Sequence, residues 1–180
     1  MKKMKNLKLK YFLPVVITIV FVIFFSQLLK KDVTKLSSQL IEKPVPTFNM
    51  PTLLNDNQSF STIDVIASDI ALVNIWSSWC IPCRSEHEIL MLLSKIEGID
   101  LYGINYKDNE DNALDFINKL GNPFKKIGVD NNGRSSMVWG VYGIPETFII
   151  HKGTVIYKHI GPIHMNELEE IILPILGDIL

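Results

Sequence analysis

The feature that most constrains the fold is a pair of cysteines placed between an apolar run and a helical sequence. Residues 71–76 (ALVNIW) are short, apolar and rich in strand-forming residues, so they predict a buried strand. Residues 82–96 follow, with apolar side chains at helical spacing, namely Ile89, Leu92, Leu93 and Ile96. Cys80 and Cys83, in the sequence WCIPC, therefore fall where a strand gives way to the first turn of a helix.

Beyond this junction the sequence predicts strands and helices in alternation. Strands are expected at 48–54, 99–105, 147–151 and 155–159, and helices at 111–120, 134–139 and 167–176. Gly98 is expected to end the helix after the cysteines, Lys152-Gly153 to form a hairpin turn, and Pro174 to interrupt the last helix. This order predicts an α/β fold with a central mixed β-sheet flanked by helices.

An uncharged stretch at residues 11–29 lies near the N-terminus. As a helix rising about 1.5 Å per residue, it would nearly match the roughly 30 Å hydrocarbon layer of a bilayer. It predicts one N-terminal transmembrane helix. The alternative is a cleaved signal peptide, against which stand the length of the stretch and the lack of a small-residue cleavage site after it.

Charge is distributed unevenly along the chain. Five lysines precede the apolar stretch and favour a cytoplasmic N-terminus. All nineteen acidic residues follow Lys31, where they outnumber the remaining Lys and Arg, so the body is acidic and nucleic acid is not an expected partner. We expect a basic cytoplasmic tail at 1–10, a transmembrane anchor at 11–29, a linker at 30–43 and a folded domain at 44–180.

Two cysteines cannot form a multi-disulfide framework, so a C-x-x-C pair is redox-active, metal-binding or incidental. Free N–H groups at a helix N-terminus stabilise a thiolate, and thiol pKa values there fall below the free value of about 8.5. Cys80 is then the expected nucleophile and Cys83 the resolving thiol, with Pro82 suited to the first helical turn. A zinc site would need two further ligands, of which His87 could supply one.

These motifs resemble the thioredoxin fold, and more closely the cytochrome c biogenesis thioredoxins known as CcmG or DsbE. The resemblance is carried by KPVPTF at 43–48, WCIPCRSEH at 79–87, GVYGIPETF at 140–148 and the N-terminal anchor. It implies a thioredoxin-like domain at 44–180 with a redox-active disulfide between Cys80 and Cys83. It also implies a cis peptide bond at Ile144-Pro145, a state adopted by only about 5–6% of X-Pro bonds.

The resemblance further implies roles for individual residues. The implied catalytic residues are Cys80, Cys83, Pro145, Glu86 and Glu146, and the implied substrate-binding residues are Trp79, Ile144 and Thr147. The proline would face the substrate peptide, and either carboxylate could relay protons near the thiols. For Glu86 the alternative is a first-turn glutamate that complements the helix dipole. His87 is expected to pack or face solvent, and Arg84 to lie on the surface.

The activity that the resemblance implies is reduction of the haem-binding disulfide of apocytochrome c, without a cofactor or a resident metal. A DsbD or CcdA type membrane carrier would supply electrons, and other cytochrome c maturation components are possible partners. The anchor would lie in the bacterial inner membrane with the domain in the periplasm. Three alternatives remain open: a general disulfide oxidase, a non-enzymatic module that holds apocytochrome or haem, and a metal chaperone.

Overall fold

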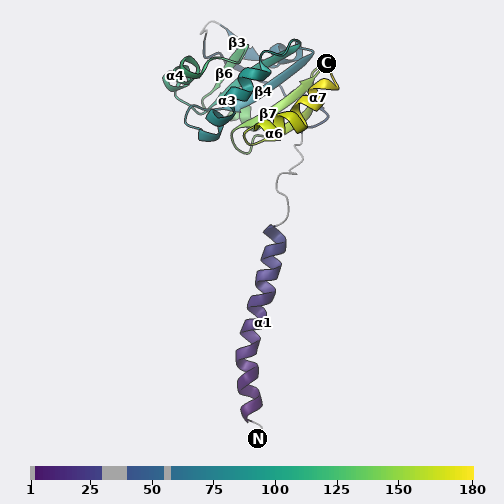
Figure 1. Cartoon of the computed structure of the whole chain (residues 1–180). Helices are drawn as coiled ribbons and strands as arrows, with labels where there is room; N and C mark the ends of the chain where they lie inside the picture. Colours follow the sequence, from purple (N-terminus) through teal and green to yellow (C-terminus); the bar gives the residue numbers. More distant parts are fainter. Residues whose placement is uncertain (1–2, 30–39, 55–57) are drawn as a thin grey trace. The chain divides into compact units, whose positions relative to one another are not determined.

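The computed structural model describes residues 3–29, 40–54 and 58–180, and the chain divides into two compact units, Met1–Leu36 and Ser37–Leu180. In the first unit a single helix, α1 (Lys3–Leu29), covers the segment for which an anchor was predicted (Figure 1). Over the described residues, no helix combines the length and the apolarity needed to cross a membrane. The transmembrane assignment is therefore not confirmed.

The second unit is built on a six-stranded sheet, with a two-stranded sheet beside it (Figure 1). The order of strands in the large sheet is β1 (Lys43–Pro44), β8 (Thr154–Ile160), β7 (Glu146–His151), β4 (Ile70–Trp76), β5 (Ile99–Tyr106) and β6 (Lys126–Asp130). β4, β5 and β6 are parallel to one another, whereas the neighbouring pairs β4–β7, β7–β8 and β8–β1 are antiparallel. The small sheet pairs β2 (Asn49–Pro51) with β3 (Ser59–Ser61). The mixed sheet is confirmed.

Helices cover both faces of the large sheet. The face with the cysteines is covered by α3 (Ile81–Leu93), α4 (Glu110–Leu120) and the C-terminal segment α6 (Met165–Glu167), η2 (Leu168–Ile172) and α7 (Leu173–Gly177). The opposite face is covered by the small sheet, α2 (Thr62–Ile66) and the end of α5 (Arg134–Val138). This arrangement is the expected α/β architecture.

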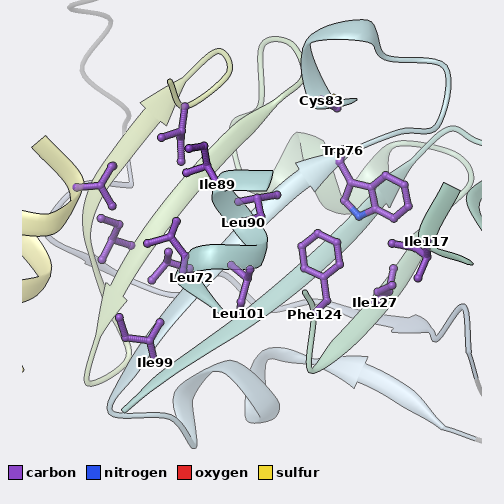
Figure 2. Packing of buried hydrophobic residues seen from close by; sticks show 14 of the residues in the cluster. Leu72, Trp76, Cys83, Ile89, Leu90, Ile99, Leu101, Ile117, Phe124 and Ile127 are labelled. Atoms are coloured by element: carbon purple, nitrogen blue, oxygen red, sulfur yellow. The ribbon is translucent and has the colours of Figure 1, made fainter. Parts of the chain in front are cut away.

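Each face has its own buried cluster. Figure 2 shows the first, in which the Trp76 ring stacks on Phe124 at 5.8 Å between ring centroids, near Leu90 and Cys83. The second is aromatic, with Trp139 packed between Phe48 and Phe148. Because side chains alternate along a strand, β7 presents Ile149 to the first cluster and Phe148 to the second.

The strands and helices expected around the cysteines and the hairpin are present, and their ends differ by a few residues. Helix α3 ends at Leu93, before the turns that lead to Gly98, and α5 ends at Val138. The hairpin turn is confirmed, since Lys152 and Gly153 both have the positive φ that a two-residue turn of this kind requires. The last helix is interrupted at Pro174 as expected: the π-helix η2 precedes it, and the α-helical segment α7 begins at Leu173 and continues past the proline.

Other expectations were confirmed only in part or were wrong. Part of the strand expected at 48–54 forms β2, which pairs with β3 in the small sheet. The assignment of residues 40–43 to the linker is corrected, because the Glu42 N–H donates to the Val155 carbonyl at 2.8 Å and Lys43 begins β1. The rest of that linker, 30–39, lies outside the described residues. The sequence also missed β1, β3, β6 and α2.

Candidate active site

The cysteine pair lies where β4 ends and α3 begins, as expected. Cys80 is the N-cap of α3 in an extended conformation, and its Sγ accepts a hydrogen bond from the Cys83 N–H at 3.1 Å. Pro82 sits in the first turn, where its missing N–H removes no helical bond. The two sulfurs form a disulfide, and both side chains are buried, with 4% of Cys80 and 2% of Cys83 exposed. The sulfur of Cys80 thus caps the N-terminus of α3.

The loop between β4 and Cys80 is held by Asp108, which follows β5. The Asp108 carboxylate accepts hydrogen bonds from the Ser78 N–H at 2.5 Å, the Ser78 hydroxyl at 2.7 Å and the Asn105 amide at 3.0 Å. Burial opposes ionisation of Asp108, but these bonds together hold its pKa below the usual value. The exposed Trp79 ring is fixed nearby, since its Nε1 donates to the Lys107 carbonyl at 3.1 Å.

Glu86 is fully buried on the face of α3 that meets the sheet. Its carboxylate accepts hydrogen bonds from Asn74 Nδ2 on β4 at 2.8 Å and from the Ile163 N–H at 3.0 Å. Burial raises the pKa of Glu86 to about 7, although these two bonds favour the charged form. The interpretation of Glu86 as a first-turn glutamate is wrong, because α3 begins at Ile81 and Glu86 lies in its second turn.

Pro145 reaches the same edge of the sheet as the cysteines. The Ile144-Pro145 bond is cis, which confirms that expectation. Pro145 directly precedes β7, whose first residue, Glu146, pairs with Ile75 near the end of β4. Ile144 is partly exposed, and Trp79 and Tyr142 are more than half exposed, so these side chains can meet a substrate.

Thr147 cannot meet a substrate in the same way. Its side chain is fully buried, and its Oγ1 accepts a hydrogen bond from Asn74 Nδ2 at 3.0 Å. The expected substrate contact is therefore corrected: Thr147 shares with Glu86 the amide of Asn74. The reason is that side chains alternate along β7, so Thr147, its second residue, points to the same buried face of the sheet as Asn74.

Glu146 lies on the face of the sheet opposite the cysteines, because it alternates with Thr147 and shares the side of Phe148. It is fully buried and pairs with Lys158 Nζ at 2.9 Å. Its other oxygen accepts from the Tyr142 N–H at 3.0 Å and the Gly143 N–H at 3.4 Å. Glu146 therefore holds the loop before Pro145, and the expectation of a proton relay beside the thiols is corrected.

His87 is buried and packs against its neighbours. Its Nε2 lies 2.9 Å from the Gly121 carbonyl, its ring meets Phe116 edge-on at 5.1 Å, and burial lowers its pKa. Arg84 is exposed and lies over the Phe116 ring at 4.8 Å. Within the described part of the chain, no three His, Cys, Asp or Glu side chains are grouped so that they could hold a metal ion.

Sequence reasoning missed three side chains that shape the site, Asn74, Asp108 and Lys158. Asn74 carried a signal, since it is the one polar residue in an otherwise apolar strand, β4. A buried amide in such a strand needs partners, and it finds them in Glu86 and Thr147. Asp108 and Lys158 carried none, because Ser78, which Asp108 binds, and Glu146, which Lys158 pairs with, are distant from them in sequence.

Comparison with known proteins agrees with this geometry. Residues 41–172 match the Redoxin family model. A thiol:disulfide interchange protein DsbE from Allochromatium vinosum is 38% identical over 150 residues, 83% of this chain and 82% of the relative. DsbE from Yersinia pestis is 36% identical over 97% of this chain and 96% of its own. CycY from Rhizobium leguminosarum is 46% identical over 61% of this chain and 59% of its own.

Among solved structures, a secreted Mycobacterium tuberculosis disulfide oxidoreductase homologous to DsbE superposes with a TM-score of 0.61 at 18% identity. That match covers 71% of this chain and 95% of the other, and at this identity it shows the shared fold alone. A cysteine pair at a helix start, a cis-proline at the same edge of the sheet and the close relatives lead to one assignment. The chain belongs to the redoxin family and, within it, to the DsbE thiol:disulfide interchange proteins, which makes it a thiol–disulfide oxidoreductase.

Proposed function

We propose that this protein reduces the haem-binding disulfide of apocytochrome c during cytochrome c maturation. The observation that carries the proposal is the position of Cys80 at the N-cap of α3, where the Cys83 N–H already points at its sulfur. In the reduced protein this N–H and the helix dipole favour a Cys80 thiolate, the species that attacks disulfides. Membership of the DsbE family supports the same chemistry.

The reaction transfers two electrons in two exchange steps. The Cys80 thiolate attacks one sulfur of the substrate disulfide, which forms a mixed disulfide and releases the other substrate sulfur as a thiolate. Cys83, once deprotonated, attacks Cys80 Sγ and releases the second substrate thiol. The substrate ends with two thiols, ready for haem attachment, and the protein ends with the Cys80–Cys83 disulfide.

Glu86 is suited to handle the proton that Cys83 must lose. It lies one turn after Cys83 on the same buried side of α3, and its pKa near 7 lets it accept and release a proton near neutral pH. Cys83 is buried in an apolar cluster, so in the reduced protein its thiol proton needs an acceptor inside the domain. In this proposal Glu86 is the proton acceptor for the resolving step.

The proposed location is the periplasmic side of a bacterial inner membrane, with residues 1–10 in the cytoplasm and 11–29 as the anchor. Support comes from the lack of charge in 11–29 and the five lysines before it. A dithiol in an oxidising compartment must be recharged, and a DsbD or CcdA type carrier in the same membrane is the proposed donor. Anchoring in the same membrane would raise the effective concentration of this carrier, and of other maturation components, around the domain.

Trapping of the mixed disulfide tests the proposal. Cys83→Ala leaves Cys80 able to attack but removes the thiol that resolves the complex, so a covalent adduct with substrate accumulates. We expect non-reducing gels and mass spectrometry to identify c-type apocytochromes joined through Cys80. The matched control is Cys80→Ala, which should trap none. Trapping by Cys80→Ala at the level of Cys83→Ala would reverse the two roles, and adducts without any apocytochrome would refute the substrate.

The direction of electron flow needs a separate measurement. A strong disulfide oxidase has a reduction potential near about −120 mV, and a reductant near about −270 mV. We expect a titration of this protein in glutathione buffers to fall toward the reducing value. A potential at the oxidising end would favour a general disulfide oxidase instead.

A further inference from the structure

The loop before the cis-proline is held by a buried ion pair. Lys158 Nζ lies 2.9 Å from Glu146 Oε2 and donates a hydrogen bond to the Gly140 carbonyl at 2.8 Å. Glu146 Oε1 accepts from the Tyr142 N–H at 3.0 Å and the Gly143 N–H at 3.4 Å. The pair therefore contacts the main chain at three residues of the loop 140–144.

The two charges reach the loop from adjacent strands. Lys158 on β8 pairs with Phe148 on β7, so it lies diagonally across from Glu146 on the same face. The ammonium also lies 4.6 Å from the centroid of the Tyr142 ring, whose side chain is 63% exposed. Almost no solvent reaches either charge, with 1% of the Lys158 side chain and none of the Glu146 side chain exposed.

We propose that Lys158 is a positioning residue for substrate, which acts through Glu146 and the loop 140–144 to hold the surface beside Pro145 in a peptide-binding shape. A buried charge pair is a weak source of stability, because desolvation offsets the attraction, so its value here lies in the geometry that it fixes. The inference needs disulfide exchange with a peptide, and does not depend on that peptide being an apocytochrome.

The other contacts of the loop lie mainly at its two ends. Gly140 has a φ of +64°, in the left-handed region, and a β-carbon there or at Gly143 would meet no neighbouring atom within 4 Å. Main-chain bonds from Gly140 and Val141 tie its start to α5, at the Met137 and Ser136 carbonyls. At Tyr142 and Gly143 the main-chain hydrogen bonds of the loop go to Glu146, and beyond them Ile144 packs against both buried clusters.

The test separates binding of a peptide from the chemistry of the thiols. Lys158→Met removes the ammonium from the Gly140 carbonyl and from Glu146. The reduced variant is assayed with insulin, a protein disulfide that must lie along the loop, and with hydroxyethyl disulfide, which needs only the thiols. We expect KM for insulin to rise between about tenfold and a hundredfold, because a displaced loop would position the protein substrate poorly. We expect kcat and the rate with the small disulfide to stay unchanged.

Two variants guard against loss of folding. Lys158→Arg keeps a cation at this place and is expected to restore KM for insulin toward the wild-type value. Lys158→Met with Glu146→Gln leaves no unpaired buried charge, yet still lacks the donor to Gly140, so the rise in KM should persist in it. Equal losses with both disulfides, or wild-type KM in this double variant, would overturn the proposal.

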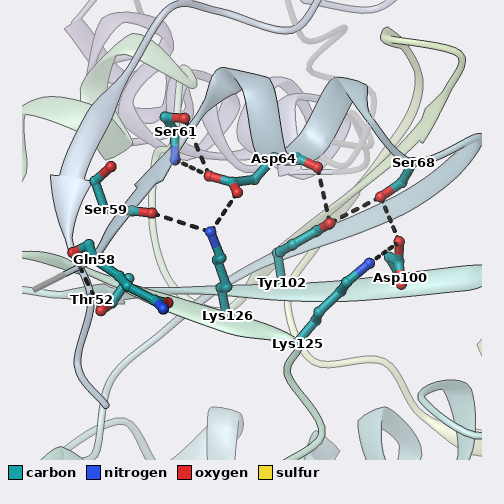
Figure 3. A network of polar contacts seen from close by, with 10 residues as sticks. All are labelled: Thr52, Gln58, Ser59, Ser61, Asp64, Ser68, Asp100, Tyr102, Lys125 and Lys126. Carbon is teal, nitrogen blue, oxygen red and sulfur yellow. Dashed lines mark hydrogen bonds and ion pairs between the residues drawn. The ribbon is translucent and has the colours of Figure 1, made fainter. Parts of the chain in front are cut away.

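The matched control is Lys126→Met. Lys126 is also a lysine on a strand of the large sheet, and it pairs with Asp64 at 2.5 Å in the polar network that Figure 3 shows. That network joins β6 to α2 and does not contact the loop 140–144. We expect this control to keep wild-type rates with both disulfides, whereas a rise in KM for insulin there would show a general effect of losing an ion pair and would refute the role of Lys158.

Discussion

At the scale of single residues, Glu86 links folding to pH. Its pKa in the folded protein is about 7, raised from 4.5, so the folded state holds this proton more tightly than the unfolded state. As pH rises from 4.5, the ordinary pKa of a glutamate, through 7, the buried carboxyl group ionises and the free energy of unfolding falls. The shift corresponds to about 3 kcal/mol in all.

We expect Glu86→Gln to remove this pH dependence. Urea unfolding of the oxidised protein, measured near pH 4 and near pH 8, should show the wild type losing about 3 kcal/mol more than the variant over that interval. Asn74 can turn its amide to present Oδ1 to the new side chain, so the fold should persist. Glu88→Gln, exposed on the same helix, is the control, and the idea fails if both variants keep the wild-type slope.

The residues of the site differ in how far sequence could predict them. Cys80 and Cys83 were identified together with their helix, because the motif and its cap are local. Glu86 was identified by resemblance, but its burial was not, because that depends on Asn74 and Ile163, which are distant along the chain. Glu146 was placed near the thiols because sequence proximity to Pro145 does not reveal which face of β7 it occupies.

At the scale of elements, β6 shows where local patterns fall short. Its five residues, KIGVD, contain a glycine and lack a clear alternation, so nothing local predicts a strand. The strand forms because Tyr102 to Tyr106 of β5 offer it a parallel partner, and because the small sheet covers its other side. Gly128 makes that cover possible, since it leaves room for Met50 and Phe60.

We expect Gly128→Ala to destabilise the domain. A β-carbon at Gly128 would lie 2.8 Å from Phe60 Cδ1 and closer still to the Met50 sulfur, both buried. Overpacking of this kind lowers the free energy of unfolding by about 1–3 kcal/mol, which chemical denaturation can measure. Gly177→Ala, whose β-carbon would meet nothing within 4 Å, is the control. Equal effects from the two variants would contradict this account of β6.

At the scale of the whole molecule, the cores lie in one unit. Both buried clusters, with the side chains packed against them, draw their residues from Leu40 onward. The sequence could predict this division because the uncharged stretch 11–29 and the acidic body differ so strongly in composition. It could not predict that the body begins by residue 40, since that boundary depends on pairing with Val155.

Removal of residues 1–36 should therefore leave the folded domain intact. We expect its free energy of unfolding to agree with that of the full chain within about 0.5 kcal/mol, because both buried clusters draw their residues from Leu40 onward. Denaturant titrations of the two proteins, with the disulfide formed in both, make the comparison. A clear drop in stability or in denaturant sensitivity would show that the first unit contributes to the fold.

The hydrogen bonds to Glu86 have a consequence for how the protein can change. The two oxygens of this carboxylate accept from an amide on the central strand and from a main-chain N–H near the last helix, so one side chain on α3 connects three distant stretches of chain. An apolar replacement of Glu86 alone would leave two buried donors stranded. A change at position 74 would relieve one of these two donors, so apolar replacements of Glu86 should be tolerated more often together with such a change than alone. Glutamine keeps an acceptor at this place and is the single replacement that we expect a selection for a folded protein to retain.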